Sequence, residues 1–372
     1  MQNNLQGKKK TLLLSRCLIC FNMKYMRFIP VLLFFIGIFY SCSTDVDLYA
    51  EYKDVPIIYA MLNSRADTNY VKITRAFCGT NDNPIDANEV ALIYDSSNYP
   101  GKLDARIYEL KYSYGGTYEY TGRMFELDTM TIHDKLEGVF YAPEQMVYYT
   151  TEPFNANTES AKYRYRLVMV KPDGDTLTAS TSMVGDEEFS IMTNGVGFQM
   201  APTNDLGRIF FRADGTAALY EVAMQFNYRE QLAGHEMKRK HIRRAFGTRT
   251  LDQFIYNAGN SYYLEYSQNW LFNTLALAIG GDTIVDPEHP NVVRYVDDFV
   301  ISISAAGEDL YYYYTTNQAQ LDSPVGFVSV YSNINGGYGL FSSRTTVKKA
   351  VNLSKNTRYE LYGKTSWGFQ EQ

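Results

Sequence analysis

The segment spanning residues 162–184 constrains the fold most strongly. Two apolar-rich runs, 162–170 and 175–184, flank the turn Lys171-Pro172-Asp173-Gly174. In the first run, Arg164 and Arg166 alternate with aromatic and aliphatic residues, which is the two-residue period of a strand with one buried face. The segment therefore predicts a β-hairpin.

Similar short runs recur along the chain, separated by turn segments rich in Gly, Asn and Asp. Short strands at this spacing are typical of a β-sandwich. In the run at 219–228, every second residue is a large apolar one, so we expect one face of it to be buried. Further strands are expected at 55–62, 70–77, 105–114, 117–127, 208–212, 237–246, 296–304, 327–330 and 342–351.

The chain is therefore expected to be mainly β. The polar sequence Gly185-Asp186-Glu187-Glu188 is a candidate domain boundary. It predicts an N-terminal immunoglobulin-like β-sandwich at 53–185 and a second β-rich domain with about two helices at 186–372. The helices are expected at 260–279, where aromatic residues recur at helical spacing, and at 308–320.

The N-terminal region has the pattern of a lipoprotein signal. Lys24 and Arg27 precede an apolar stretch at 28–40, which is too short to span a bilayer and suits a signal peptide. Ser41 and then Cys42 follow. We expect residues 1–41 to be removed, Cys42 to carry a lipid, and 42–52 to form a tether. The alternative is an ordinary secretory signal followed by an unrelated cysteine.

Charge and cysteine content limit the possible functions. Cleavage before Cys42 would remove six basic residues and no acidic one, leaving 29 basic against 41 acidic residues and a net charge of −12. An acidic chain of this kind does not suit nucleic acid, whose phosphates bind basic surfaces. Cys17 and Cys20 would also be removed, so Cys78 would be the second remaining thiol and no intrachain disulfide would be possible.

One basic cluster interrupts this acidic sequence. It consists of Lys238, Arg239, Lys240, Arg243 and Arg244. As a functional site, it would contact phosphate groups or an acidic partner. As a structural feature, it would be an exposed strand whose charges prevent pairing with another sheet edge. The second interpretation is favoured.

No motif predicts a catalytic, cofactor-binding or metal-binding residue. His235-Glu236 lacks the second histidine of a zinc protease motif, because Arg239 stands at that position. Two oxygen-rich segments, 81–89 and 282–288, are candidate calcium loops, but polar turns account for both, and neither has a standard spacing.

The last third of the chain carries a family resemblance. Asp297-Asp298-Phe299-Val300-Ile301-Ser302, Glu308-Asp309-Leu310-Tyr311 and the sequence at 330–344 resemble uncharacterised outer-membrane lipoproteins of the Bacteroidota. The segment Tyr-Val-Lys-Ile-Thr-Arg-Ala-Phe at 70–77 is similar too. These proteins carry a domain of unknown function, and many accompany TonB-dependent transporters. The resemblance implies a β-rich body at the outer membrane and no particular catalytic residue.

These observations lead to one functional expectation and two alternatives. The chain is expected to be a lipid-anchored accessory of the outer membrane that binds a glycan, a peptide or a protein partner in nutrient uptake, with a TonB-dependent transporter as the candidate partner. Asp45 and Asp47 modestly favour the cell surface over the periplasmic face. A glycan-active enzyme and an adhesion or assembly subunit are the alternatives.

Overall fold

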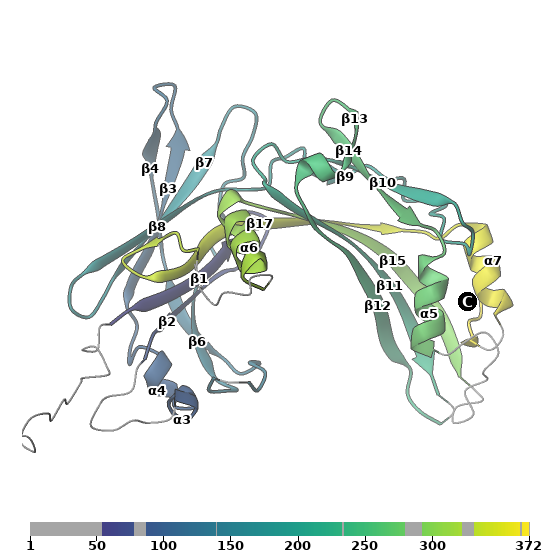
Figure 1. Ribbon diagram of the computed structural model, residues 1–372, viewed down its shortest axis with the longest axis horizontal. Coiled ribbons are helices and arrows are strands. Elements are labelled where there is room, and N and C mark those ends of the chain that lie inside the picture. Colours follow the sequence, from purple (N-terminus) through teal and green to yellow (C-terminus); the bar gives the residue numbers. More distant parts are fainter. Residues whose placement is uncertain are drawn as a thin grey trace, which may run out of the picture. The chain divides into compact units, whose positions relative to one another are not determined.

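A computed structural model describes residues 54–77, 87–138, 140–232, 234–279, 292–321, 331–364 and 367–371 (Figure 1). The side chains of 87, 88 and 317–321 are not described. The protein is mainly β, as the sequence predicts. Among the described residues, no helix is both long enough and apolar enough to cross a membrane. The signal segment, Cys42, the tether, Cys78 and the candidate strand at 327–330 lie outside the described residues.

The described strands form three sheets, in which strands distant in the chain are often neighbours (Figure 1). The strands are β1 Pro56–Leu62, β2 Asn69–Arg75, β3 Asp104–Tyr112, β4 Tyr118–Glu126, β5 Asp128–Ile132, β6 Gln145–Thr150, β7 Tyr163–Val170, β8 Thr176–Ser182, β9 Ser190–Ile191, β10 Leu206–Arg212, β11 Leu219–Gln231, β12 Lys238–Arg249, β13 Ile255–Ala258, β14 Ser261–Ser267, β15 Val293–Ala306, β16 Ile334–Asn335 and β17 Tyr338–Val351. The helices are α3 Ala87–Ala91, α4 Tyr94–Ser97, the 3₁₀ helix η1 Leu251–Gln253, α5 Trp270–Ile279, α6 Glu308–Leu321 and α7 Lys355–Gly363.

The first core has the two-sheet arrangement of a sandwich. One sheet has the order β16-β8-β7-β3-β4, and the other contains β1, β2, β6 and β5. The predicted hairpin is β7 and β8, in which Tyr165 and Leu167 are buried and Arg166 is exposed. Their side chains pack with Ile58, Val71 and other buried residues into one cluster. Alternation along each strand therefore places the apolar side chains between the sheets.

The second core lies against the other half of the largest sheet, whose order is β12-β11-β15-β17-β1-β2-β6-β5. Val222, Met224 and Phe226 on β11 are fully buried or nearly so, as their alternation predicts. They pack with residues of β10, β14, α5 and α7. Apart from Ile334 and Phe341, the residues of the first cluster end at Met183 along the chain, and the second cluster begins at Val184, beside the predicted boundary. A division into two domains stays a prediction.

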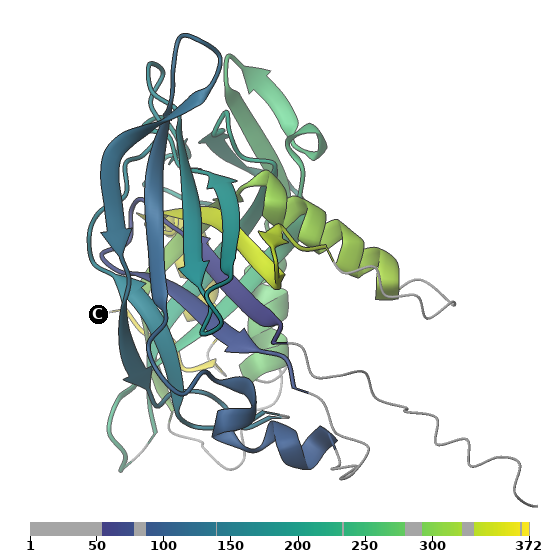
Figure 2. The same cartoon turned by 90° about the vertical axis from the view of Figure 1, so that its left-hand side faces the viewer.

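The C-terminal strand β17 links the two cores. Its first part pairs in parallel with β1, so that Gly339 is opposite Ile58, and its last part pairs with β15. Figure 2 shows β1 and the beginning of β17 side by side, although they are far apart in the sequence. Gly339 has a φ of 120°, and a Cβ there would lie 1.9 Å from the carbonyl oxygen of Ile58. Only glycine allows this close approach.

Two sequence expectations need correction or addition. The segment 260–279 was expected to be one helix, but its first part is the strand β14, and only α5 is helical. Full pairing of β14 with β10 explains the difference, because strand pairing between distant segments overrides a local helical pattern. Helix α6 confirms the second expectation. Helix α7 was not anticipated.

Candidate ligand-binding pocket

A pocket with a mostly apolar lining lies on the solvent side of β1 and β2. It has a volume of about 510 Å³. Ile58 and Ile73 point into the sandwich core, so the residues between core positions point the opposite way and form the pocket floor. The floor consists of the cross-strand pairs Tyr59 with Lys72 and Ile57 with Thr74. The alternation that builds the sandwich core therefore also builds this floor.

The walls come from three segments that are distant in the sequence. They are the end of β2 and the residues after it, the end of α4, and the connection between β5 and β6. Phe140 is half exposed, and Tyr59 is 43% exposed, so aromatic rings stay accessible at this site. The wall residues are Arg75, Ala76, Phe77, Ser97, Asn98, Lys135, Phe140, Tyr141, Glu144 and Gln145.

Cations outnumber acids in the pocket. Among the described residues, Lys72, Arg75 and Lys135 line it together with one acid, Glu144. The Glu144 carboxylate also lies 3.5 Å from Nδ1 of His133. In a chain with more acidic than basic residues, this is a local reversal of charge. A pocket with excess positive charge and apolar walls suits an anion that carries an apolar group.

Lys72 is the most strongly perturbed cation of the pocket. Burial, and secondarily the charge of Lys135, lowers its pKa to about 8. Its Nζ donates a hydrogen bond to the carbonyl oxygen of Met146 at 2.9 Å. Nζ of Lys135 donates in turn to the carbonyl oxygen of Tyr141. Each ammonium group has three donors, so both retain capacity to bind an anion.

Two further polar atoms of the pocket lining lack partners among the described residues. Nε of Arg75 and Oδ1 of Asn98 are both buried and make no hydrogen bond there. Asn98 as a whole is only 6% exposed, and its amide nitrogen donates to the carbonyl oxygen of Tyr94. Buried polar atoms are usually satisfied, so these two are exceptions, and both are enclosed by the protein rather than open to the cavity.

The aromatic group on the floor is held by α6. Tyr59 packs edge to face with Tyr313, with ring centroids 6.4 Å apart. Burial, followed by the hydrogen bond with Tyr313, raises the pKa of Tyr59 to about 12. Tyr59 therefore presents a neutral ring and hydroxyl at physiological pH. It can contact an apolar group without adding charge to the site.

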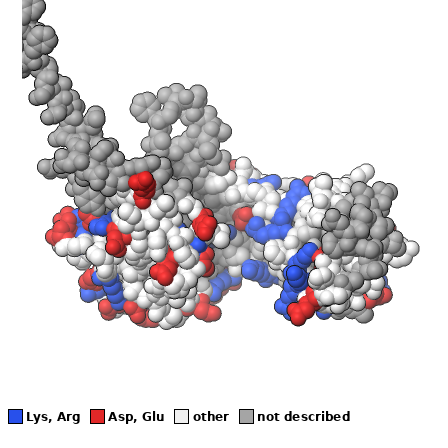
Figure 3. All heavy atoms as spheres, turned by 90° about the horizontal axis from the view of Figure 1, so that it is seen from below, with Lys and Arg blue, Asp and Glu red and all other residues white. Residues whose placement is uncertain are grey.

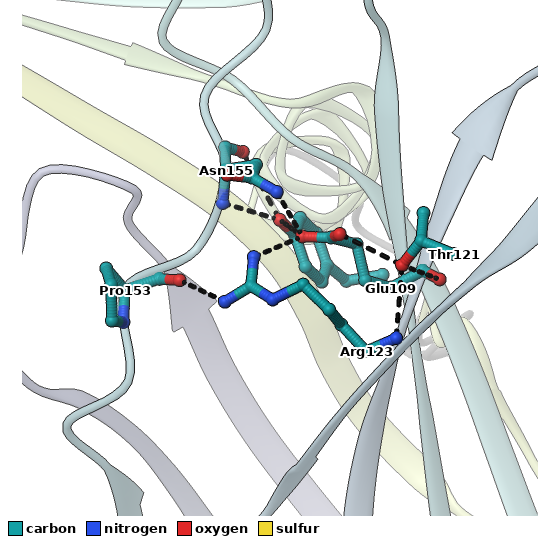
Figure 4. A network of polar contacts seen from close by, with 6 residues as sticks. Glu109, Thr121, Arg123, Pro153 and Asn155 are labelled. Atoms are coloured by element: carbon teal, nitrogen blue, oxygen red, sulfur yellow. Dashed lines mark hydrogen bonds and ion pairs between the residues drawn. The ribbon is translucent and has the colours of Figure 1, made fainter.

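A second buried charge, Glu109, has a different environment (Figure 4). Its carboxylate is 1% exposed and accepts hydrogen bonds from Thr121, Arg123, Asn155 and Tyr165, at 2.9 to 3.0 Å. Figure 4 shows the side chains of Thr121, Arg123 and Asn155 converging on Glu109. Burial and the neighbouring carboxylate raise the pKa of Tyr165, so its hydroxyl remains a donor. This charge is fully satisfied within the protein, which indicates a structural role.

The predicted basic cluster lies on β12, which forms an edge of the largest sheet. All five of its cations are exposed. Lys240 pairs with Glu230, and Arg243 pairs with Glu221 at 3.3 Å, whereas Lys238 and Arg239 have no ion pair among the described residues. Figure 3 shows Lys and Arg gathered in a few groups on the face seen from below. Whether the cluster binds a partner stays a prediction.

One cation of this cluster, Lys240, pairs with a buried carboxylate. Glu230 is 6% exposed and accepts from Lys240 and from Arg294, whose Nη2 is 2.7 Å away. Burial alone would raise the pKa of Glu230, but the hydrogen bonds from Lys240 and Arg294 lower it. Lys240 therefore stabilises a buried carboxylate, which the sequence pattern did not reveal.

A polar pocket of about 440 Å³ contains Glu308 and Asp309, the first two residues of α6. Both oxygens of Asp309 are occupied, since Thr181 and Tyr331 donate to them at 3.0 and 2.9 Å. Consecutive helical residues do not face one another. These acids therefore do not form the opposed pair of carboxyl groups that glycoside hydrolysis requires.

The two candidate calcium loops remain predictions. Most of the loop 81–89 and all of 282–288 lie outside the described residues. Within the part of the chain that the structure describes, no group of three or more His, Cys, Asp or Glu side chains is placed to hold a metal ion.

No protein-family model matches the chain, and a search of curated proteins found no match.

Proposed function

We propose that the protein is a lipid-anchored accessory of the outer membrane that binds a ligand in the pocket on β1 and β2. The observation that carries the proposal is the group of Lys72, Arg75 and Lys135 around an apolar cavity in an otherwise acidic chain. Elsewhere in the protein, Arg123 and Arg294 have acidic partners, Glu109 and Glu230. Cations that outnumber the acids around a cavity are better explained by an external anion.

The apolar segment before Cys42 and the resemblance of 296–344 to Bacteroidota lipoproteins support the location. A lipid on Cys42 would keep the pocket near the membrane, and a TonB-dependent transporter is the proposed partner in nutrient uptake. The tether at 42–52 would allow the body to reach that partner.

The location is tested by Cys42→Ala in the native organism. The change should abolish labelling with a radioactive fatty acid and should move the protein from the membrane fraction to the soluble fraction. Ser43→Ala is the matched control and should change neither property. Membrane association and lipid labelling that both survive Cys42→Ala would refute the anchor.

The partner is tested by purifying the tagged, lipidated protein from its own membrane. The proposal expects a transporter barrel to copurify in stoichiometric amount. Repeated recovery of the protein alone, under conditions that keep other outer-membrane complexes intact, would contradict this part of the proposal.

A further inference from the structure

The inference concerns the chemical class of the ligand, and it rests on the proposed binding function. We propose that the pocket on β1 and β2 takes a small molecule with one anionic head group, such as a carboxylate, on an apolar body. The head group lies between Lys72 and Lys135, and the body lies against the aromatic rings of the lining.

The head-group position follows from the donors. Lys72 projects from the floor and Lys135 from the β5–β6 connection, so the two ammonium groups approach the same cavity from different segments. Their mutual influence is large enough that Lys135 contributes to the perturbation of Lys72. An anion between them removes this repulsion and gains two charge-assisted hydrogen bonds. Arg75 is a further cation of the same lining.

The apolar body follows from the remaining surface. Ile57, Tyr59, Phe77, Phe140 and Tyr141 supply most of the apolar lining. Phe140 already has Nζ of Lys135 5.8 Å from its ring centre, so a cation and an aromatic ring are adjacent in the wall. A purely polar anion would leave these rings exposed to water. A molecule with an apolar body would cover them and gain the free energy of that burial.

The acidic residue of the lining does not cancel the cations. Glu144 is exposed and has His133 as a nearby partner. It can also reject ligands of the wrong charge distribution, because a second anionic group near it would be repelled. The single acid thus favours a ligand with one anionic end over one with charges at both ends.

The test uses three probes with the same apolar body: 4-phenylbutyrate, its amide and 4-phenylbutylamine. Their affinities for the full chain are measured by isothermal titration calorimetry at pH 7. We expect the carboxylate to bind at least about tenfold more tightly than the amide, since charged hydrogen bonds exceed neutral ones in strength by that order. We expect the amine to bind most weakly.

Variants locate the head group. Lys72→Met and Lys135→Met should each lower the affinity for the carboxylate by about tenfold and leave that for the amide nearly unchanged. Lys111→Met, on the exposed end of β3, is the matched control and should have no effect. Circular dichroism spectra and thermal unfolding of each variant establish that it is folded.

Equal affinity for the carboxylate and the amide, or preference for the amine, would overturn the inference while leaving a binding pocket in place. Absence of binding by all three probes would overturn it as well. Neither result would decide membrane attachment or transporter recovery, which test the proposed function separately.

Discussion

The carboxylate of Glu109 and the cations of the pocket are two ways of placing charge beneath the surface of the same sandwich. Glu109 lies inside the core and is surrounded by four donors from the protein itself. Lys72 lies on the other side of its sheet, where another lysine faces it and burial weakens its charge. The protein itself supplies the partners of the Glu109 carboxylate, whereas a bound anion would supply a partner of opposite charge for Lys72.

The difference between Glu109 and Lys72 suggests that the first charge serves stability and the second serves binding. A satisfied buried charge contributes to one native structure, and removing a partner is costly. An incompletely satisfied charge lowers stability and is retained where it does something else, as perturbed groups in cavities often do. Removing a partner of Glu109 should therefore lower the stability of the protein, whereas removing the charge of Lys72 should raise it.

Arg123→Met should have the largest effect on stability. Arg123 donates to Glu109 at 3.0 Å and lies over the Phe125 ring at 4.9 Å. Its loss should lower the free energy of unfolding by about 2 kcal/mol, the cost of a charged hydrogen bond to a buried group. Urea denaturation measures this, with Arg239→Met as the exposed control. Probe binding should be unchanged, and a loss of binding equal to that in Lys72→Met would remove the distinction between the two regions.

Thr74→Phe should fill the pocket from its floor. We expect binding of both 4-phenylbutyrate and its amide to fall at least tenfold, which corresponds to about 1.4 kcal/mol, because a ring would occupy the cavity. Stability should change little, since Thr74 points away from the sandwich core. Thr117→Phe, at the exposed residue directly before β4, makes the same exchange away from the pocket. If both variants bound the probes as the unchanged chain does, the ligand would not lie in this pocket.

Lys72→Met should change how stability depends on pH. Lys72 has a folded-state pKa of about 8 against an ordinary value of 10.5, so folding releases its proton between these values. The stability of the unchanged chain should therefore rise as pH increases from 8 towards 10.5. At pH 7, Lys72→Met should be more stable by about 1 kcal/mol after allowance for partial solvent screening.

The advantage of Lys72→Met should shrink at higher pH, and chemical denaturation at pH 7 and 9.5 measures the change. Lys111→Met should show no such trend. A Lys72→Met variant that is less stable than the unchanged chain at pH 7 would mean that Lys72 is satisfied within the protein, like Glu109.

The smallest effect is expected on β12. Lys238→Gln and Arg239→Gln remove exposed cations that have no ion pair among the described residues. Each should change the free energy of unfolding by less than about 0.5 kcal/mol. Thermal unfolding at low and high salt measures it. A larger loss would show that surface charge matters to this fold as much as the Glu109 cluster does.

Local patterns predicted the elements whose partners are close in the sequence. The hairpin of β7 and β8 has its turn, its alternation and its pairing within one short segment. Helix α6 likewise follows from residues beside it. In contrast, β14 depends on pairing with β10. Its aromatic residues fit helical and strand spacing equally, so the sequence pattern wrongly predicted a helix there.

The pocket could not be predicted, for the same reason. The alternation at 70–77 places Lys72 opposite the buried Val71 and Ile73. The alternation does not predict that Lys135 lies in the same pocket, because the pairing of β2 with β6 and of β6 with β5 positions it there. Glu109 also looked like one more strand residue, because its donors come from three other segments: β4, β7 and the connection that contains Asn155. A charged site formed by distant strands cannot be predicted from the pattern of any one segment.

The most direct test of the account is the number of protons taken up when the full chain binds 4-phenylbutyrate at pH 8.5. Isothermal titration calorimetry in two buffers with different ionisation enthalpies gives this number. The groups of the lining that face Lys72 are Tyr59, Arg75, Lys135 and Glu144.

Lys72 is partly neutral at pH 8.5, since its pKa is about 8, and a bound carboxylate should restore its charge. The account predicts uptake of a clear fraction of a proton, which disappears in Lys72→Met and persists in Lys111→Met. A binding heat that is the same in both buffers, or uptake that survives Lys72→Met, would contradict the claim that Lys72 receives an anion in this pocket.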